Sequence, residues 1–459
     1  MENPLIEMDN SATRALANFA SNLSYEHIPT EVKEHIKLLF LDGIGCCIQG
    51  NTLPWTKKLM EVVLNTSDPK TCTIIGTNIQ TSVLNAVLIN STAGHGFEAD
   101  DIHRESILHP NSIIVPVAIN VSEKLKNING KKFLTAVIAG YEIATRVGSA
   151  AGTELLLKGF HPQGTHGTIA ATVTAAKLMN LNSDQMLNAI GIAGSLGAGL
   201  MAAQEGAMVK RLHSGRAAEA GVLAAELAAK DFTGIPDIIE AEYGGFLSSF
   251  SGKNNFSRAI LQLGEVWECK NTGIKPYTSV TSIHAALDCL KAIMAKNQIS
   301  HDQIKEIKAK ISHPTYVHCA WPYKKFSVTS AQMNIYYGLA QMALEGELFV
   351  DQFNLDKISN PKILDYIKKI TAEVDPEIEK LGHEFRHMAS LEVITNDNRK
   401  FSHTEKYRKG SPENPVPKKE ILSKFNTLAK FSLDQTKIDE LQEKIQKIEN
   451  LNSLENLFN

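Results

Sequence analysis

The fold of this chain follows from the stretch GTIAATVTAAKLM at residues 167–179, together with AIGIAGSLGAGLMAA at 189–203 and RAAEAGVLAAELAA at 216–229. Alanine, glycine, serine and threonine dominate these segments, and charged residues are few. Small side chains let helix axes approach closely, whereas a solvent-exposed helix carries a charged face. The three segments therefore predict tightly packed central helices in a mainly α fold.

The pattern changes after Trp267. Alternating apolar and charged residues at 307–311 indicate a strand, Asn396-Asp397-Asn398 marks the turn of a hairpin, and helical runs lie at 281–296 and 330–346. A proline-rich segment at 411–417 precedes two last helical runs, the second with Ser432 and Gln435 placed for a capping box. We expect an all-helical domain formed by residues 1–264 and 412–459, with an α+β lid domain at 265–411 inserted into it.

Composition narrows the class of protein. The 459 residues exceed the roughly 250–300 that one core usually supports. The chain is 43% hydrophobic and 21% charged with a net charge of -3, and no basic face suggests nucleic acid as a partner. No apolar run approaches the roughly 20 residues of a membrane span, and the N-terminus lacks the features of a signal peptide. A cytoplasmic protein with no membrane partner is expected, and its six scattered cysteines suit reduced core thiols.

Titratable residues gather in the segment GHGFEADDIHRESILHP at 94–110, where three histidines, four carboxylates and an arginine stand between two apolar helical runs. Its acidic pair Asp100-Asp101 is expected just beyond a helix at 82–97. His109-Pro110 and His161-Pro162 each place an imidazole before a rigid proline and a long apolar helix. A solvated helix end, or histidines that satisfy backbone carbonyls, would explain part of this pattern, but the density of charged groups favours an active site.

Cationic residues occur near the mouth of the predicted bundle. Lys210 and Arg211 follow a segment of small residues, and Lys275, Tyr277 and His284 stand at the start of the lid. Buried cations need partners, which the acidic segment or an anionic ligand would supply. No H-E-x-x-H pattern is present, so we expect no metal site, and the absence of P-loop and G-x-S-x-G motifs disfavours nucleotide chemistry and serine hydrolysis.

At these residues the chain resembles the MmgE/PrpD family, which includes 2-methylcitrate dehydratase, cis-aconitate decarboxylase and iminodisuccinate epimerase. The segments that carry the resemblance are HGFEADDIH, KGFHPQGTHGTIAATVTAAKLMNL, KRLHSGRAAEAGVLAAELA, FTGIPDIIEAEYGGF, KPYTSVTSIHAALD and KGSPENPVP. The resemblance implies a homodimer of two-domain subunits that acts without cofactor on small di- or tricarboxylates. The matching site positions are Glu98, Ile102, His109, His161, Lys210 and His284, and the family commonly has Asp and Thr at the first two.

The resulting hypothesis is a lyase of the dehydratase or decarboxylase type. Proton transfer beside a carboxylate needs a base and nearby cations. We expect His161 to transfer the proton, His284 to act as a second acid or base, and His109 and Lys210 to bind the carboxylate. Substrate binding is assigned to six more residues, in which the acids orient the substrate: Glu98, Asp101, Ile102, Arg211, Lys275 and Tyr277. A dicarboxylate epimerase and a non-catalytic carboxylate-binding protein are the alternatives.

Overall fold

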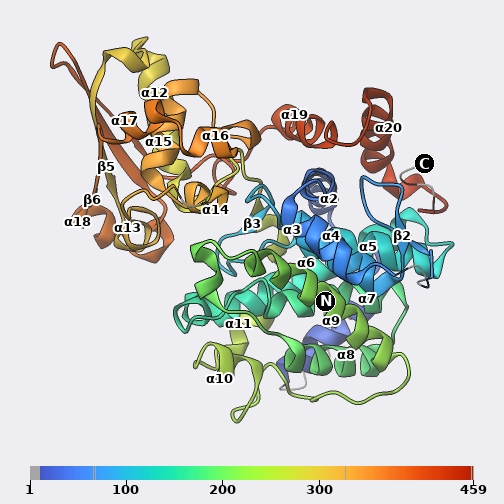
Figure 1. Cartoon of the computed structure of the whole chain (residues 1–459). Coiled ribbons are helices and arrows are strands. Elements are labelled where there is room, and N and C mark those ends of the chain that lie inside the picture. The colour runs from blue at the N-terminus through green and yellow to red at the C-terminus, as the bar shows by residue number, and fades with distance from the viewer. Residues whose placement is uncertain (1–10, 66, 68, 326, 456, 458–459) are drawn as a thin grey trace.

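The computed structural model describes residues 11–65, 67, 69–325, 327–455 and 457. It has a large helical part and a smaller α+β part, joined to one side of it (Figure 1). The prediction of a mainly α fold with an α+β unit is confirmed.

The N-terminal segment of the helical part contains the helices α1 to α11. Its helices are α1 Ala12–Asn22, α2 Thr30–Gly50, α3 Pro54–Val63, α4 Val83–Gly94, α5 Asn111–Leu125, α6 Gly130–Leu157, α7 His166–Leu178, α8 Ser183–Leu196, α9 Val209–Ala228, α10 Phe246–Phe250 and α11 Phe256–Ile260. Two short antiparallel pairs accompany them, β1 Cys72–Thr73 with β2 Gln80–Thr81, and β3 Ile102–His103 with β4 Thr272–Gly273.

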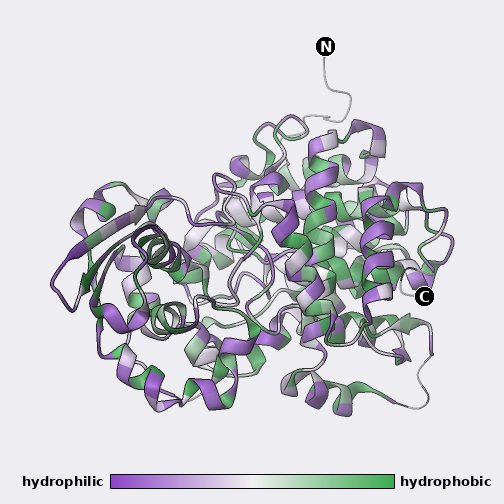
Figure 2. Ribbon diagram, turned by 90° about the horizontal axis from the view of Figure 1, so that it is seen from above, coloured by the Kyte–Doolittle hydropathy of each residue, from purple (hydrophilic) through white to green (hydrophobic). Residues whose placement is uncertain are grey.

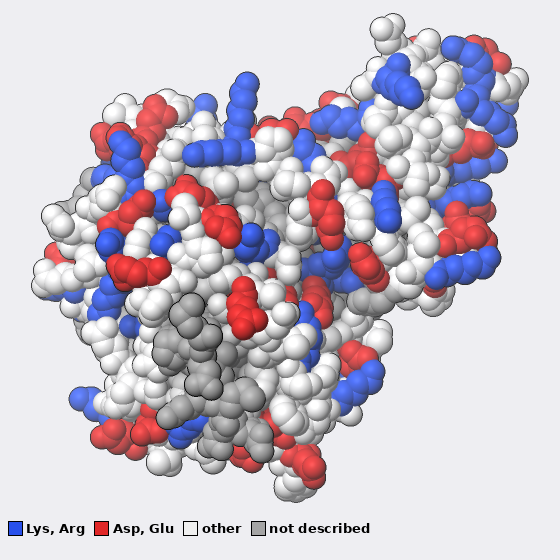
Figure 3. All heavy atoms as spheres, turned by 180° about the vertical axis from the view of Figure 1, so that it is seen from behind, with Lys and Arg blue, Asp and Glu red and all other residues white. Residues whose placement is uncertain are grey.

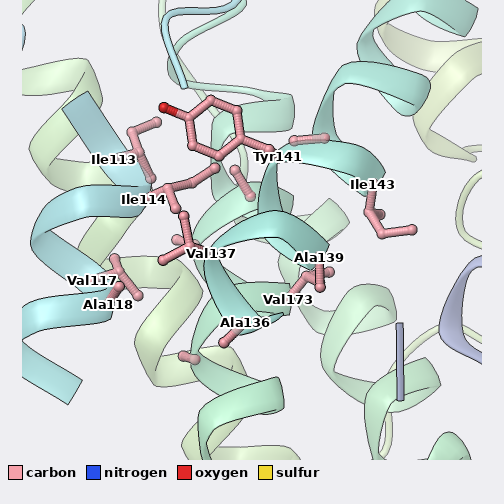
Figure 4. Close-up of a cluster of buried hydrophobic side chains, with 14 of the residues drawn as sticks. Ile113, Ile114, Val117, Ala118, Ala136, Val137, Ala139, Tyr141, Ile143 and Val173 are labelled. Carbon is pink, nitrogen blue, oxygen red and sulfur yellow. The ribbon is translucent and has the colours of Figure 1, made fainter. Parts of the chain in front are cut away.

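The central helices approach closely because small residues line their crossings. A Cβ atom added to Gly221 of α9 would lie 2.4 Å from the Cβ of Ala171 in α7, and one added to Gly215 would lie 2.2 Å from Thr92 Oγ1 in α4. Larger aliphatic side chains fill the spaces beside these crossings, and Figure 4 shows Ile113 and Ile114 of α5 near Val137 of α6. The core is therefore formed by backbone contact as much as by side-chain packing.

The prediction of one helix over 189–203 is wrong. The helix α8 ends at Leu196, and a loop leads to a 3-10 turn at Met201–Glu205. Gly199 has a φ of 148°, a backbone conformation that favours glycine, and its carbonyl accepts a hydrogen bond from the His161 amide at 3.0 Å. The two glycines at 197 and 199 therefore turn the chain toward the segment that carries His161.

The α+β part contains a four-stranded sheet in the order β6-β5-β7-β8, formed by β5 Ile304–Ile311, β6 Ile370–Val374, β7 Ala389–Thr395 and β8 Lys400–Glu405. The strand β5 runs parallel to β6 and antiparallel to β7. The hairpin predicted around Asn396–Asn398 is confirmed as β7 and β8. The accompanying helices are α12 His284–Asn297, α13 His313–Cys319, α14 Val328–Gln332, α15 Ile335–Glu345, α16 Leu355–Ile358, α17 Pro361–Ile367 and α18 Pro376–Lys380.

The last helices, α19 Lys418–Ala429 and α20 Gln435–Gln446, lie beside the helical part (Figure 1). Both contact α2, and Phe425 and Leu441 belong to the core of the helical part. The predicted Ser432 capping box is wrong, because Asp434 accepts the capping hydrogen bond from Lys437 N at 2.9 Å.

The two parts have separate hydrophobic cores. Trp267 and Ile274 belong to the helical core, whereas Tyr277 belongs to the α+β core, so the change of core falls between residues 274 and 277. Phe97, although it follows α4, packs in the α+β core. Figure 2 shows hydrophobic residues concentrated on the inner helices of the helical part. The segment after α4 therefore joins the two cores.

The distribution of charges on the surface and the burial of the cysteines agree with what the composition predicts. On the face seen from behind, Lys and Arg are interspersed with Asp and Glu (Figure 3). All six cysteines are buried and free, which confirms the expected core thiols. Within the described residues, each helix is too short or too polar to span a lipid bilayer.

Candidate active site

The site is built on the loop that follows α4. The helix begins after its cap Ser82 but ends at Gly94, so the predicted helical end at Phe97 is wrong. Glu98 has a φ of 55°, in the left-handed region that residues with a Cβ rarely adopt. Burial of Phe97 in the α+β core accompanies this turn and directs the following acids between the two parts.

Three cations surround the carboxylate of Glu98. Its Oε1 accepts hydrogen bonds from Lys210 Nζ and, at 2.6 Å, from Arg211 Nη1, while Lys275 Nζ lies 3.3 Å from Oε2. All four side chains are buried. Burial raises the pKa of Glu98, but Lys210, Lys275 and Arg211 together hold it well below its ordinary value. Burial lowers the pKa of Lys210 to about 8, against the opposing effect of Glu98.

Three histidines lie beside this cation cluster. His95 Nδ1 pairs with Asp100 Oδ2 at 2.6 Å, and His109 Nδ1 donates to the carbonyl of Asp101 at 2.6 Å. The ring centroid of His95 lies 5.2 Å from that of His109 and 5.7 Å from that of His161. Burial lowers the pKa of His95, lowers that of His109 to about 3, and holds that of His161 well below its usual range. These rings are therefore neutral near pH 7.

His161 is held on both sides of its ring. Its backbone amide donates to Gly199, and its Nδ1 lies 2.8 Å from His213 Nδ1 in α9. One of these nitrogens must carry the shared proton, so each ring fixes the tautomer of the other. Burial lowers the pKa of His213 to about 4, so both rings of the pair are neutral at pH 7.

Gln163 fixes the backbone of His109, a role that the sequence did not indicate. Its Oε1 accepts from His109 N and its Nε2 donates to His109 O, both at 3.0 Å. The same amide donates to Ser112 and Ser214, so α5, α9 and the His161 loop are tied together. His318 of α13 lies near Lys210. Burial and the positive charge of Lys210 lower the pKa of His318 to about 4.

Asp101 and Ile102, predicted to bind substrate, instead stabilise the fold around the site. The Asp101 carboxylate accepts from Asn111 N at 3.0 Å and from the Tyr141 hydroxyl at 2.9 Å, and burial raises its pKa well above the ordinary value. It therefore holds the start of α5 and positions His109 through its own carbonyl. Ile102 lies in β3 and pairs with Gly273, two residues before Lys275.

Tyr277 and His284 form a second group at the start of the α+β part. The Tyr277 hydroxyl donates to Asp288 at 2.7 Å, and its ring packs edge-on against His284 with centroids 5.2 Å apart. His284 Nε2 lies 3.1 Å from Ser279 O, and its buried Nδ1 has no hydrogen-bond partner among the described residues. Lys275 links this group to the acidic loop, because its Nζ lies 3.3 Å from Glu98 and 3.5 Å from Asp100.

The cluster offers anion binding and proton transfer more readily than metal binding. His103, a possible ligand by sequence, turns away to Ser106 at 2.9 Å and toward Glu268. Across the part of the chain that the structure describes, no group of three His, Cys, Asp or Glu side chains has the arrangement of a metal site. Cations at 210, 211 and 275 instead converge where a carboxylate would be stabilised.

The sequence matches known proteins over nearly the whole chain. Residues 14–259 match the MmgE/PrpD N-terminal domain and residues 277–450 match the MmgE/PrpD C-terminal domain. A cis-aconitate decarboxylase of Aspergillus terreus is 29% identical over 98% of this chain and 95% of its own length. A cis-aconitate decarboxylase-like protein of Aspergillus oryzae is 28% identical over 96% and 95%, and the human cis-aconitate decarboxylase is 25% identical over 97% and 93%. The chain belongs to the MmgE/PrpD family.

Proposed function

We propose that this protein is a lyase that decarboxylates a small di- or tricarboxylic acid. The observation that carries the proposal is a cluster of three buried cations, Lys210, Arg211 and Lys275, which Asp100 links to a row of neutral histidines. The names of the relatives support decarboxylation, since each is described as a cis-aconitate decarboxylase or as similar to one.

The chemistry needs two functions from the site. When carbon dioxide leaves, the electron pair of the broken carbon–carbon bond stays on a carbon that is conjugated with a remaining carboxylate. Cations beside that carboxylate stabilise the developing charge, and a proton donor then quenches the carbon. Lys210 and Arg211 supply the first function in this proposal, and His161 supplies the second.

The remaining residues position the substrate. His109 Nδ1 donates to Asp101 O, so Nε2 of the neutral ring carries no proton and binds a substrate carboxyl group when either that group or the ring is protonated. Glu98 orients the ends of Lys210 and Lys275. His284, whose Nδ1 is unpartnered among the described residues, acts as a second acid or base when the α+β part closes over the substrate. None of these steps requires a cofactor, and we propose that the reaction proceeds without one.

The test is an assay of the purified protein with cis-aconitate in deuterated water, after dialysis against a chelator. Release of carbon dioxide with one deuterium in the product supports the proposal. Loss or gain of water would identify a dehydratase, and deuterium exchange without loss of water or carbon dioxide would identify an epimerase. Tight carboxylate binding with no turnover across a substrate panel would identify a binding protein, and activity restored only by added metal would refute the cofactor-free reaction.

We also propose that the protein is a homodimer formed through the face between α8 and α9. Leu196, Leu200, Met208 and Val209 are 41%, 63%, 50% and 47% exposed. Leu196, Leu200 and Val209 line an apolar cavity of about 640 Å³ that His213 also lines. Apolar residues grouped in this way favour a protein partner. Light scattering should give twice the subunit mass, and Leu200→Glu should give the monomer mass; a wild-type monomer would contradict the proposal.

A further inference from the structure

The ion cluster around Glu98 is not electrically balanced. Lys210, Arg211 and Lys275 contribute three positive charges, while Glu98 and Asp100 contribute two negative charges. All five side chains are at most 6% exposed, so solvent screens them weakly. Counted over the described side chains that form these ion pairs, the cluster carries one positive charge in excess.

The groups around the histidines do not remove this excess. His95, His109 and His161 face each other, His213 and the five charged residues of the cluster, and burial keeps these imidazoles neutral at pH 7. Of the other charged groups nearby, Asp42 and Lys424 pair with one another at 2.7 Å and cancel. The Asp101 carboxyl is directed to Asn111 N and the Tyr141 hydroxyl, where burial raises its pKa well above the ordinary value and disfavours a negative charge. A buried positive charge without a counter-ion is unfavourable, so the cluster is suited to one additional anion.

Two buried nitrogen atoms in the cluster are free to bind a ligand. Arg211 Nη2 and His95 Nε2 each lack a hydrogen-bond partner among the described residues. Both belong to side chains that are otherwise fixed, Arg211 by Glu98 and His95 by Asp100. Native proteins rarely leave such atoms unpaired. Arg211 Nη2 can donate directly to a carboxylate, whereas His95 Nε2, which carries no proton while Nδ1 donates to Asp100 from a neutral ring, becomes a donor when the ring takes up a proton.

We propose that the substrate is a dicarboxylate that binds together with one proton, which is taken from solvent onto the histidine row. The first carboxylate neutralises the excess charge of Lys210, Arg211 and Lys275. The second carboxylate brings a further negative charge, which an imidazole of His95, His109 or His161 compensates by becoming an imidazolium. This inference rests on the proposed function, because the loaded imidazolium is then the donor that protonates the carbon.

Glu98 sets the number of protons in this scheme. With its negative charge present, the cluster balances one carboxylate and the second requires a proton. With a neutral side chain at this position, the cluster would carry two excess charges and both carboxylates would be balanced without protonation. Glu98 is therefore a positioning residue whose charge controls the proton donor, although it does not itself touch the reacting carbon.

Calorimetric titration with succinate at about pH 7 tests the inference, because this saturated dicarboxylate offers no decarboxylation or dehydration and is fully ionised. Repeating the titration in buffers of different ionisation enthalpy gives the number of protons taken up. We expect about one-quarter to one proton for the wild type and a value near zero for Glu98→Gln, with the smaller wild-type figure if the bound imidazole titrates close to its ordinary pKa. Glu219→Gln, on the same helix as Lys210 but paired with exposed Arg216, should keep the wild-type value.

The pH dependence of succinate affinity is a second test, and it does not require Glu98→Gln, a variant in which the three cations lose part of their pairing. Succinate should bind the wild type up to about tenfold more weakly for each unit of pH above the titration of the loaded imidazole, the dependence expected for uptake of one proton. Glu98→Asp, which keeps the negative charge, should show the same pH dependence of succinate affinity. Failure of succinate to bind, binding with no proton uptake, or equal uptake in the wild type and folded Glu98→Gln would each overturn the inference. Since succinate is not turned over, these results are independent of whether the protein decarboxylates any acid.

Discussion

At the scale of single residues, the site depends on a few neutral imidazoles that buried neighbours hold in fixed orientations. His161 has its amide on Gly199 and its ring on His213, while His109 is held by Asp101 and Gln163. Such rings have little freedom to reorient, which is the condition for transferring a proton to one face of a bound substrate. The proposed proton transfer therefore depends on the hydrogen bonds that hold these rings.

Replacement of His161 by Ala should lower turnover by about a hundredfold or more, the usual effect of removing a general acid or base. Succinate affinity should change much less, because Lys210, Arg211 and Lys275 remain in place. Steady-state kinetics with calorimetry separates the two effects. The exposed His27 offers a control, since His27→Ala should preserve turnover. Near-normal turnover in His161→Ala would assign proton transfer to another group.

The sequence indicated the segments of the site but not the direction of each side chain. Glu98, Lys210, Arg211 and Lys275 meet because buried cations need counter-ions, a physical requirement that can be read from the residues alone. By contrast, His95 and His103 look equivalent in the sequence, yet only His95 joins the histidine row. The difference arises in β3, which pairs with β4 some 170 residues later and turns His103 toward Glu268.

At the scale of elements, helix crossings depend on the absence of side chains. Gly221→Ala should destabilise the protein by about 1–3 kcal/mol, because the added methyl meets Ala171 Cβ at 2.4 Å and the Thr168 carbonyl at 2.7 Å. Chemical denaturation measures the change. Gly45→Ala is a matched comparison with a smaller expected cost, since its nearest contact is Phe425 Cδ2 at 3.2 Å. Equal free energies of unfolding for both variants and the wild type would show that α7 and α9 can move apart to accept the methyl group at no cost.

The same small residues explain where prediction of the elements succeeded and failed. Alanine-rich segments became α7 and α9, because helix propensity and close packing favour the same conformation. The segment at 189–203 has a similar composition, but its glycines at 197 and 199 allow the backbone to bond with Gly164 and His161 instead of continuing the helix. These tertiary hydrogen bonds outweigh the helix propensity of the segment, and no sequence pattern predicts them.

At the scale of the whole molecule, the candidate site lies where two hydrophobic cores adjoin. Phe97 anchors the acidic loop in the α+β core. The helices α4, α5 and α9, which pack in the helical core, position the other residues of the site. Lys275 bridges Glu98 and Asp100 from the segment where the chain passes between the cores. We therefore expect a ligand that binds the cations to contact both parts at once and its binding to close the α+β part as a lid.

Hydrogen exchange should detect this closure. A saturating di- or tricarboxylate should slow amide exchange in residues 94–110 and 275–284 together, although these segments are far apart in the sequence, because the ligand links the cations of α9 to Lys275 and draws His284 toward the loop. The outer hairpin at 389–405 serves as an internal control and should exchange at an unchanged rate. Lys275→Met should uncouple the two segments, since this lysine carries the ion pairs between them. Protection of 94–110 alone in the saturated wild type would show that the α+β part does not close on the ligand and would remove His284 from the reaction.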